Sequence, residues 1–190
     1  MSNIRLIVGL GNPSAEYAYT RHNAGFWFVD QVANKYNCKL YNEGKFFGNV
    51  GRFKFHDTDV YLLQPQTYMN LSGKSVLALA QFYKILPDQI LVAHDELDFI
   101  AGVIKLKQAG GNGGHNGLRD IDRVIGKEYW RIRLGIGHPG DKNKVADYVL
   151  KKPSVDDEIS IHNAIDKGLA NLELILSGQM SQAMKNIHTE

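Results

Sequence analysis

The chain has 190 residues, of which 44% are hydrophobic and 22% are charged, and its formal net charge is +2. These values indicate a globular protein with a single domain over residues 1–190, and they exclude a membrane protein, because no apolar run approaches the roughly 20 residues of a transmembrane helix. Cys38 is the only cysteine. We therefore expect no intramolecular disulfide and, since the N-terminus carries no signal pattern, a cytoplasmic location.

The first half of the chain alternates between strand and helix patterns. Short apolar runs predict strands over residues 4–10, 46–55 and 60–63, and the last two form a hairpin. Apolar residues at helical spacing predict helices over 24–36 and 72–85.

The second half continues this alternation. The same criteria predict three strands, over residues 90–93, 103–107 and 130–136. They also predict three helices, over residues 118–125, 156–176 and 179–187. The expected fold is therefore α/β, with a single domain and a mixed sheet covered by helices on both faces.

Three segments combine Asn with His and Gly and do not resemble core, namely residues 11–25, 67–73 and 110–118. Amide side chains donate and accept hydrogen bonds without carrying charge, which suits an uncharged substrate with many oxygen atoms. Asn12 and Asp95 both follow predicted strands, and sites in such folds gather where strands end. We therefore expect these two residues to meet.

His22 and Asp95 are candidates for acid–base catalysis. A histidine titrates near neutral pH and suits a general base, and a carboxylate fixes its tautomer and stabilises the imidazolium. The alternatives are structural: His22 bonds a carbonyl at the start of a helix, or Asp95 is a loop or cap residue.

Asn70 and Asn116 each lie just before a predicted helix, where asparagine often acts as the cap. Ser72 offers another cap for the first of these helices, which leaves Asn70 free to face a cleft. Asn116 follows a glycine-rich loop that lets main-chain amides approach a ligand. A capping role and a role in the site remain open for both residues.

The charge is unevenly distributed along the chain. Residues 101–152 contain eleven basic and five acidic side chains, whereas residues 153–190 contain two basic and six acidic ones. A basic segment next to a glycine-rich loop fits a polyanionic partner, and the alternative is a solvated surface over which the charges are dispersed.

Other motifs are weaker. Residues 9–14 resemble the glycine-rich motif of dinucleotide-binding folds. That motif must lead directly into a helix, which Pro13 disfavours here. The chain has no P-loop, no nucleophile elbow and no His-Glu-x-x-His pair. Six residues offer metal ligands without a metal-binding spacing: His22, His94, Asp95, Glu96, His115 and His138.

Six motifs together resemble the bacterial-type peptidyl-tRNA hydrolases. In chain order they are Gly-Leu-Gly-Asn-Pro (9–13), Thr-Arg-His-Asn-x-Gly (20–25), Thr-Tyr-Met-Asn-x-Ser-Gly (67–73), His-Asp-Glu-Leu-Asp (94–98), Gly-Gly-His-Asn-Gly-Leu (113–118) and Arg-x-Gly-Ile-Gly-His-Pro (133–139). Each motif is weak alone, but six in register are highly specific. Three positions depart from the family pattern, which has glycine, lysine and histidine where this chain has Ser14, Gln64 and Asn112.

The resemblance implies an esterase that releases peptide and tRNA from peptidyl-tRNA, without a cofactor or metal and as a monomer. It implies that His22 activates water, that Asp95 orients His22, and that Asn12 and Asn70 position substrate and water. One of these amides would stabilise the oxyanion.

The resemblance also assigns binding roles. Asn116 and the main chain of Met69 would hold the peptide, and Tyr17 would contact the tRNA end. The tRNA side would be lined by basic residues and one histidine, namely Lys105, Lys107, Arg133 and His115.

Three alternatives remain at this stage. The main one is a non-catalytic RNA-binding protein of the same fold, which would not need the His22–Asp95 pair. The others are a metal-dependent hydrolase and a nucleotide-dependent oxidoreductase.

Overall fold

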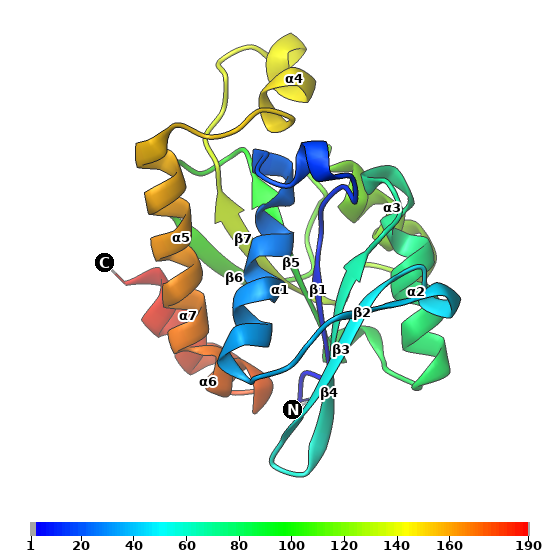
Figure 1. Ribbon diagram of the computed structural model, residues 1–190. Helices are drawn as coiled ribbons and strands as arrows, with labels where there is room; N and C mark the ends of the chain where they lie inside the picture. The colour runs from blue at the N-terminus through cyan, green and yellow to red at the C-terminus, as the bar shows by residue number, and fades with distance from the viewer. Residues whose placement is uncertain (1–2, 190) are drawn as a thin grey trace.

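The computed structural model describes residues 3–189, which form one seven-stranded sheet between two layers of helices (Figure 1). The strands are β1 (Leu6–Gly9), β2 (Tyr41–Glu43), β3 (Gly48–Phe55), β4 (Thr58–Pro65), β5 (Ile90–Glu96), β6 (Ile104–Gln108) and β7 (Trp130–Gly135). Their order across the sheet is β2-β3-β4-β1-β5-β7-β6.

The centre of the sheet is parallel and its margins are antiparallel. β1 runs parallel to both β4 and β5, and β5 runs parallel to β7. The pairs β2–β3, β3–β4 and β6–β7 are antiparallel. The parallel strands therefore end at one common edge, which is where β1 and β5 deliver the polar segments that follow them.

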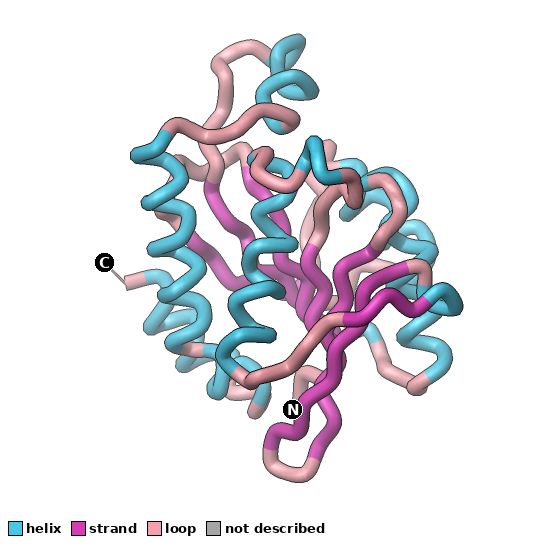
Figure 2. The backbone as a smooth tube through the Cα atoms, viewed as in Figure 1, coloured by secondary structure: helices cyan, strands magenta, loops and turns pink. Residues whose placement is uncertain are grey.

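Helices cover both faces (Figure 2). One face carries α1 (Ala24–Lys35), α5 (Val155–Ala170), α6 (Leu172–Leu176) and α7 (Met180–His188), and the other carries α2 (Ser72–Phe82) and α3 (Asn116–Ile125). Successive strand side chains point to opposite faces, so Ile7 packs in one core while Leu6 and Val8 pack in the other. The single-domain α/β fold with a mixed, doubly covered sheet is thus confirmed.

One predicted element is wrong. The sequence predicts a single helix over residues 156–176, but α5 ends at Ala170 and α6 begins at Leu172. The Asn171 side chain between them donates to the Lys167 carbonyl and accepts from Asn186. A short polar side chain that bonds nearby main chain competes with helical hydrogen bonds, which explains the break.

Two short elements were not predicted. β2 has three residues, all exposed, so its sequence shows no burial alternation. The five-residue helix α4 (Val145–Val149) buries only Val149 and stands above the edge of the sheet where the parallel strands end (Figure 1). No helix in the described part of the chain is long and apolar enough to cross a membrane.

Candidate active site

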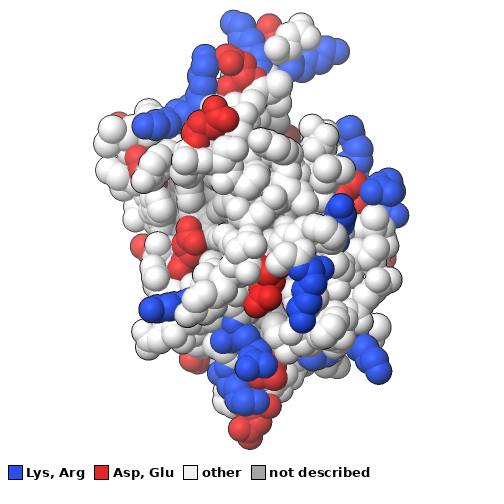
Figure 3. All heavy atoms as spheres, turned by 45° about the vertical axis from the view of Figure 1, so that its right-hand side comes forward, with Lys and Arg blue, Asp and Glu red and all other residues white. Residues whose placement is uncertain are grey.

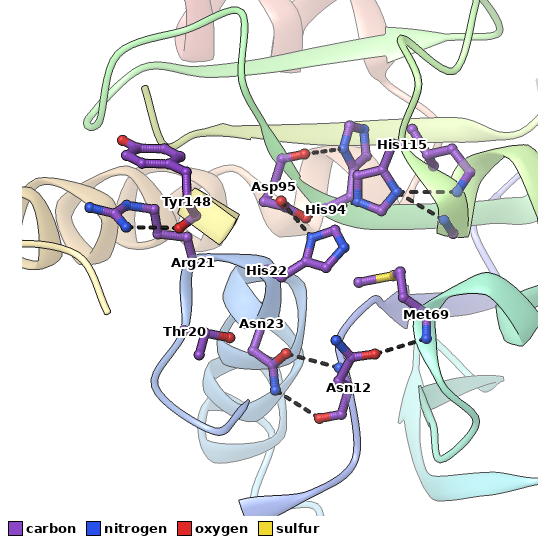
Figure 4. A network of polar contacts seen from close by, with 12 residues as sticks. Asn12, Thr20, Arg21, His22, Asn23, Met69, His94, Asp95, His115 and Tyr148 are labelled. Atoms are coloured by element: carbon purple, nitrogen blue, oxygen red, sulfur yellow. Dashed lines mark hydrogen bonds and ion pairs between the residues drawn. The ribbon is translucent and has the colours of Figure 1, made fainter. Parts of the chain in front are cut away.

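Polar side chains meet at the edge where the parallel strands end (Figure 4). Asn12 follows β1, Asp95 lies near the end of β5, and the register pairs Gly9 of β1 with Ala93 of β5. The short 3-10 helix η2 (Arg21–Asn23) places His22 directly before α1. Asn12 and Asp95 therefore lie at the same edge of the sheet, with His22 between them (Figure 4).

A close approach of α1 to the sheet brings His22 to this edge. A Cβ atom on Gly25 would lie 2.4 Å from the Ala93 carbonyl oxygen and 2.5 Å from the Leu10 amide nitrogen. Only glycine permits this contact, because real Cβ atoms do not approach other atoms so closely. The first turn of α1, with His22 just before it, is therefore fixed against β5.

Asp95 bridges two histidines. Nδ1 of His22 lies 2.8 Å from one Asp95 carboxylate oxygen, and Nε2 of His115 lies 2.8 Å from the other. The Nδ1 atom of His115 accepts the main-chain N–H groups of Gly117 and Leu118. His115 therefore carries its proton on Nε2 and donates it to Asp95, because a neutral imidazole has one donor and one acceptor.

The carboxylate is ionised. Burial raises the pKa of Asp95, but the electrostatic interactions and hydrogen bonds with His22 and His115 outweigh that burial and hold the pKa of Asp95 well below its usual range. For His22, burial lowers the pKa, but the charge and hydrogen bond of Asp95 outweigh it and raise the pKa above 6.5. His22 thus meets the two requirements of a general base, a fixed tautomer and a nearby negative charge.

Asn12 is held in one orientation. Asn23 accepts from the Asn12 amide at 2.9 Å and donates to the Asn12 carbonyl at 3.0 Å. The Asn12 side-chain oxygen accepts the Met69 amide at 2.8 Å. The side-chain NH2 of Asn12 is therefore the end left for a ligand.

The main chain of Met69 is expected to hold the peptide, but its N–H and its carbonyl already have partners within the protein. Its N–H is used by Asn12, and its carbonyl accepts the Ser72 hydroxyl at 2.7 Å. Met69 therefore has no free main-chain donor.

Two hollows meet beside His22. The first, of about 290 Å³, is bordered by Asp95, His115 and the glycine loop, and the second by Asn12, Met69 and Asn70. Four residues line both hollows: His22, Asn116, Ala146 and Val149. They form one cleft, and α4 provides a wall of it.

Neither Asn70 nor Asn116 caps a helix with its side chain, so the capping alternative is wrong for both residues. His115, not Asn116, accepts the amides at the start of α3, and Asn116 is exposed towards the cleft. At α2 neither Asn70 nor Ser72 caps with its side chain, since the hydroxyl of Ser72 donates backwards to Met69.

Not every predicted residue reaches the cleft. Tyr17, in the short helix η1 (Ala15–Tyr17), lines neither hollow. Lys105 and Lys107 lie on the edge strand β6, next to Arg131 and Arg133 of β7. Arg133 makes an ion pair with Glu96 at 2.8 Å, so its charge is partly balanced.

The exposed positive charge also gathers elsewhere. Figure 3 shows Lys and Arg side chains around the segment that carries α4, at the top of the molecule. The exposed lysines of this segment are Lys142, Lys144, Lys151 and Lys152, and Lys142 lines the first hollow. Basic side chains therefore approach the cleft itself.

The three departures from the family pattern make local contacts. Buried Gln64 donates to Asp30 at 2.7 Å and joins β4 to α1, and the side chain of Asn112 accepts the Gly114 amide at 2.9 Å. The hydroxyl of Ser14 lies 3.5 Å from that of Tyr68. None of these residues contacts Asp95.

Sequence reasoning missed two residues of the site. Asn23 clamps the main chain of Asn12, and its place beside His22 in a polar segment was the available signal. His94 is buried beneath His115, with ring centroids 5.3 Å apart. Burial and the electrostatic interaction with His115 lower the pKa of His94 to about 3, so His94 stays neutral near physiological pH.

His22, Asp95 and His115 bring their donor atoms within 4.8 Å of one another, close enough to surround a metal ion, but these atoms are paired by hydrogen bonds. Both histidine nitrogens lie 2.8 Å from the carboxylate oxygens, a hydrogen-bond distance. Nε2 of His115 carries a proton, whereas a ligating histidine nitrogen must be free of one.

Comparison with known proteins agrees with these observations. The family model described as "Peptidyl-tRNA hydrolase" matches residues 6–190. Proteins named peptidyl-tRNA hydrolase from Yersinia pseudotuberculosis and Neisseria meningitidis are each 54% identical to this chain. The first match covers 99% of this chain and 97% of the relative, and the second covers all of both.

Solved structures extend this similarity to three dimensions. A crystal structure of peptidyl-tRNA hydrolase from Acinetobacter baumannii matches with a TM-score of 0.97 and 54% identity, covering 100% of this chain and 96% of that one. The predicted resemblance is therefore confirmed, and the non-catalytic alternative is not favoured, because these relatives are named as enzymes. With a matching family model, full-length relatives and a shared fold, this chain belongs to the peptidyl-tRNA hydrolase family.

Proposed function

We propose that this chain hydrolyses the ester bond between a peptide and the terminal ribose of tRNA, with His22 as the general base. The observation that carries the proposal is the hydrogen bond of 2.8 Å between Nδ1 of His22 and buried Asp95. With its proton on Nδ1, His22 has its lone pair on Nε2, and its ring borders both hollows of the cleft (Figure 4).

The reaction needs one base that later acts as an acid. Nε2 of His22 takes a proton from water, and the oxygen of that water attacks the ester carbonyl carbon. The tetrahedral intermediate then breaks its bond to the ribose oxygen, which takes the proton back from Nε2. The products are a peptide with a free carboxylate and a tRNA with a free hydroxyl.

Asn12 stabilises the oxyanion in this scheme. The Met69 amide donates to the Asn12 side-chain oxygen, so the NH2 group of Asn12 points away from that amide. A donor fixed before the reaction stabilises developing negative charge without reorganisation. Asp95 stabilises the imidazolium of His22 in the same step, and His115 supports Asp95 from the opposite side.

Two amides are placed to hold the peptide. Asn70 and Asn116 are exposed and line the hollow that also contains Asn12. Amide side chains that bond peptide main chain do not distinguish between side chains, which suits a substrate of any sequence. Met69 contributes by fixing Asn12.

The tRNA is held mainly through its phosphates. Lys105, Lys107 and Arg133 provide a basic strip on β6 and β7, and Lys142 lines the cleft. Tyr17 contacts the tRNA end from outside the hollows. Phosphate contacts position an RNA without reading its sequence, as an enzyme for many tRNAs requires.

We further propose that the enzyme is a cytoplasmic monomer that needs no cofactor. Every residue assigned to the site comes from one chain, so no partner copy is needed to complete it. Light scattering coupled to size-exclusion chromatography tests the oligomeric state, and a dimer would contradict it.

Hydrolysis of an N-blocked aminoacyl-tRNA in the presence of a chelator tests the function. The wild-type protein is expected to release the blocked amino acid, and His22→Ala to lose nearly all of this activity while keeping its melting temperature. A folded wild type that binds tRNA without cleaving it would support an RNA-binding role instead. Loss of wild-type activity on adding chelator would support metal-dependent hydrolysis.

A further inference from the structure

Helix α2 begins without a local cap. The first amides of a helix have no partner within the helix and need acceptors from elsewhere. Leu71 occupies the capping position and has no acceptor in its side chain. The Ser72 side chain does not replace it: its hydroxyl points back to the Met69 carbonyl and accepts none of the first amides of α2.

The missing acceptor comes from α3. One carboxylate oxygen of Asp120, a residue with 8% exposure, accepts the Gly73 amide at 2.7 Å. The other oxygen lies 2.9 Å from the guanidinium of Arg123. A negative charge at the start of a helix interacts favourably with the helix dipole, and hydrogen bonds to a carboxylate are stronger than neutral ones.

The two helices touch at this point. A Cβ atom on Gly73 would lie 2.6 Å from the Asp120 carbonyl oxygen and 2.7 Å from its carboxylate. Glycine is therefore required at position 73. The position of the start of α2 relative to α3 is set by this contact.

Both helices carry an amide of the cleft close to this contact. Asn116 lies four residues before Asp120 on α3, so the two residues share one face of the helix. Asn70 lies three residues before Gly73, and its side chain makes no hydrogen bond to any other residue within 3–189. The position of Asn70 therefore depends on its main chain.

That main chain is anchored on both sides of Asn70. The Met69 amide is bound by Asn12, and the Gly73 amide is bound by Asp120. The anchor at Met69 also orients the proposed oxyanion donor. Removing the anchor at Gly73 would break the hydrogen bond of this segment to α3 and leave it held by the hydrogen bonds around Met69 and Leu71.

We propose that Asp120 is a positioning residue that fixes Asn70 opposite Asn116 by capping α2 from α3. This inference rests on the proposed function, because it concerns the same cleft and the same substrate. Asp120 touches neither the substrate nor the reacting atoms. Its effect on the reaction passes through the main chain of residues 70–73.

The first test compares two helix caps. Asp120→Ala removes the acceptor at α2, and Ser154→Ala removes a similar acceptor at α5, where the Ser154 hydroxyl accepts the Asp157 amide at 3.1 Å. Both are expected to lower the melting temperature. Only Asp120→Ala is expected to lower kcat/KM for N-blocked aminoacyl-tRNA, by about tenfold to a hundredfold, the usual effect of misplacing a binding group. Equal kinetic losses in both variants would refute the proposal.

The second test asks whether Asp120 acts through Asn70. If it does, Asp120→Ala added to Asn70→Ala causes little further loss, because the positioned side chain is already gone. If the losses of kcat/KM in the two single variants multiply in the double variant, the inference is overturned. Asp120→Asn keeps an acceptor and is expected to retain most activity. Asp120→Ser, which is too short to reach Gly73, replaces the alanine variant in the cycle if the latter does not fold.

A third measurement does not depend on catalysis. Amide hydrogen exchange at residues 70–75 is expected to be faster in Asp120→Ala and unchanged in Ser154→Ala. Faster exchange with unchanged kcat/KM would show a purely structural cap and refute the inference. A wild type with protected amides and no hydrolysis would instead contradict the proposed function.

Discussion

Asp95 carries a buried negative charge between His22 and His115, and its two hydrogen bonds give these histidines different roles. His115 is committed as a donor, because its other nitrogen accepts two main-chain amides. His22 keeps a free nitrogen on the cleft side and has a raised pKa. The pH dependence of the reaction should therefore report on His22.

We predict that kcat/KM rises with pH to a plateau, with a midpoint above 6.5. A general base works only when neutral, and the charge of Asp95 keeps His22 protonated to a higher pH. In Asp95→Asn that charge is absent while burial still lowers the pKa of His22, so the midpoint should move down and the plateau should fall. Rates measured from about pH 5 to 9 test this, and equal midpoints for both proteins would contradict it.

The Asn12→Asp variant tests the role of the Asn12 NH2 group separately from that of its side-chain oxygen. Aspartate keeps an oxygen for the Met69 amide but loses the NH2 group and brings a negative charge near the oxyanion. We expect kcat to fall by about 100-fold to 1000-fold, as for loss of one oxyanion donor. The melting temperature should change little. A variant with near wild-type kcat would rule out Asn12 as the donor.

At the scale of elements, the site depends on how closely α1 meets β1 and β5. Gly25→Ala places a methyl group within 2.4 Å of the Ala93 carbonyl and 2.5 Å of the Leu10 amide. We expect a loss of about 1–3 kcal/mol in the free energy of unfolding, as for other overpacked cores. Because α1 must shift, His22 should also lose its contact with Asp95 and kcat should fall.

Gly44→Ala is the matched control for Gly25→Ala. A Cβ atom at position 44 meets no atom within 4 Å. Its melting temperature and kcat should match those of the wild type. If Gly25→Ala also left both unchanged, the close contact between α1 and the sheet would not be essential.

At the scale of the whole molecule, basic side chains lie along the β6 edge of the sheet and around α4 (Figure 3 shows the latter). A polyanion that follows this surface passes the mouth of the cleft. Since such binding releases counterions, its strength falls with salt.

We predict that KM for a tRNA substrate rises with salt concentration while kcat stays nearly constant. Lys105→Ala should raise KM at low salt and reduce the slope of log KM against log salt by about 0.7–0.9, the effect of one lost phosphate contact. Lys54→Ala is the control, because Lys54 lies in the β3–β4 hairpin beside Asp59. A slope unchanged by Lys105→Ala would exclude Lys105 from the tRNA contacts.

The sequence by itself determined the alternation of elements, the fold class and the family. These follow from local information: apolar periodicity distinguishes strand from helix, and glycines and polar residues mark turns. Six motifs in register then identified the candidate base, its carboxylate and the asparagines. The local pattern failed at Asn171, where the side chain binds the Lys167 carbonyl in place of the helical main-chain amide and is also held by Asn186 of α7.

Only the tertiary structure decided how these residues work together. The contacts that matter here join residues 20 to 73 positions apart in the chain. They are the contacts of Asp95 with His22 and His115, of the Met69 amide with Asn12, and of Asp120 with the start of α2. Periodicity carries no information about such pairs, because they depend on the path of the main chain between them. The sequence identified most of the groups in the proposed site, and the packing of α1 and α3 on the sheet decided which ring nitrogens of His22 and His115 face Asp95.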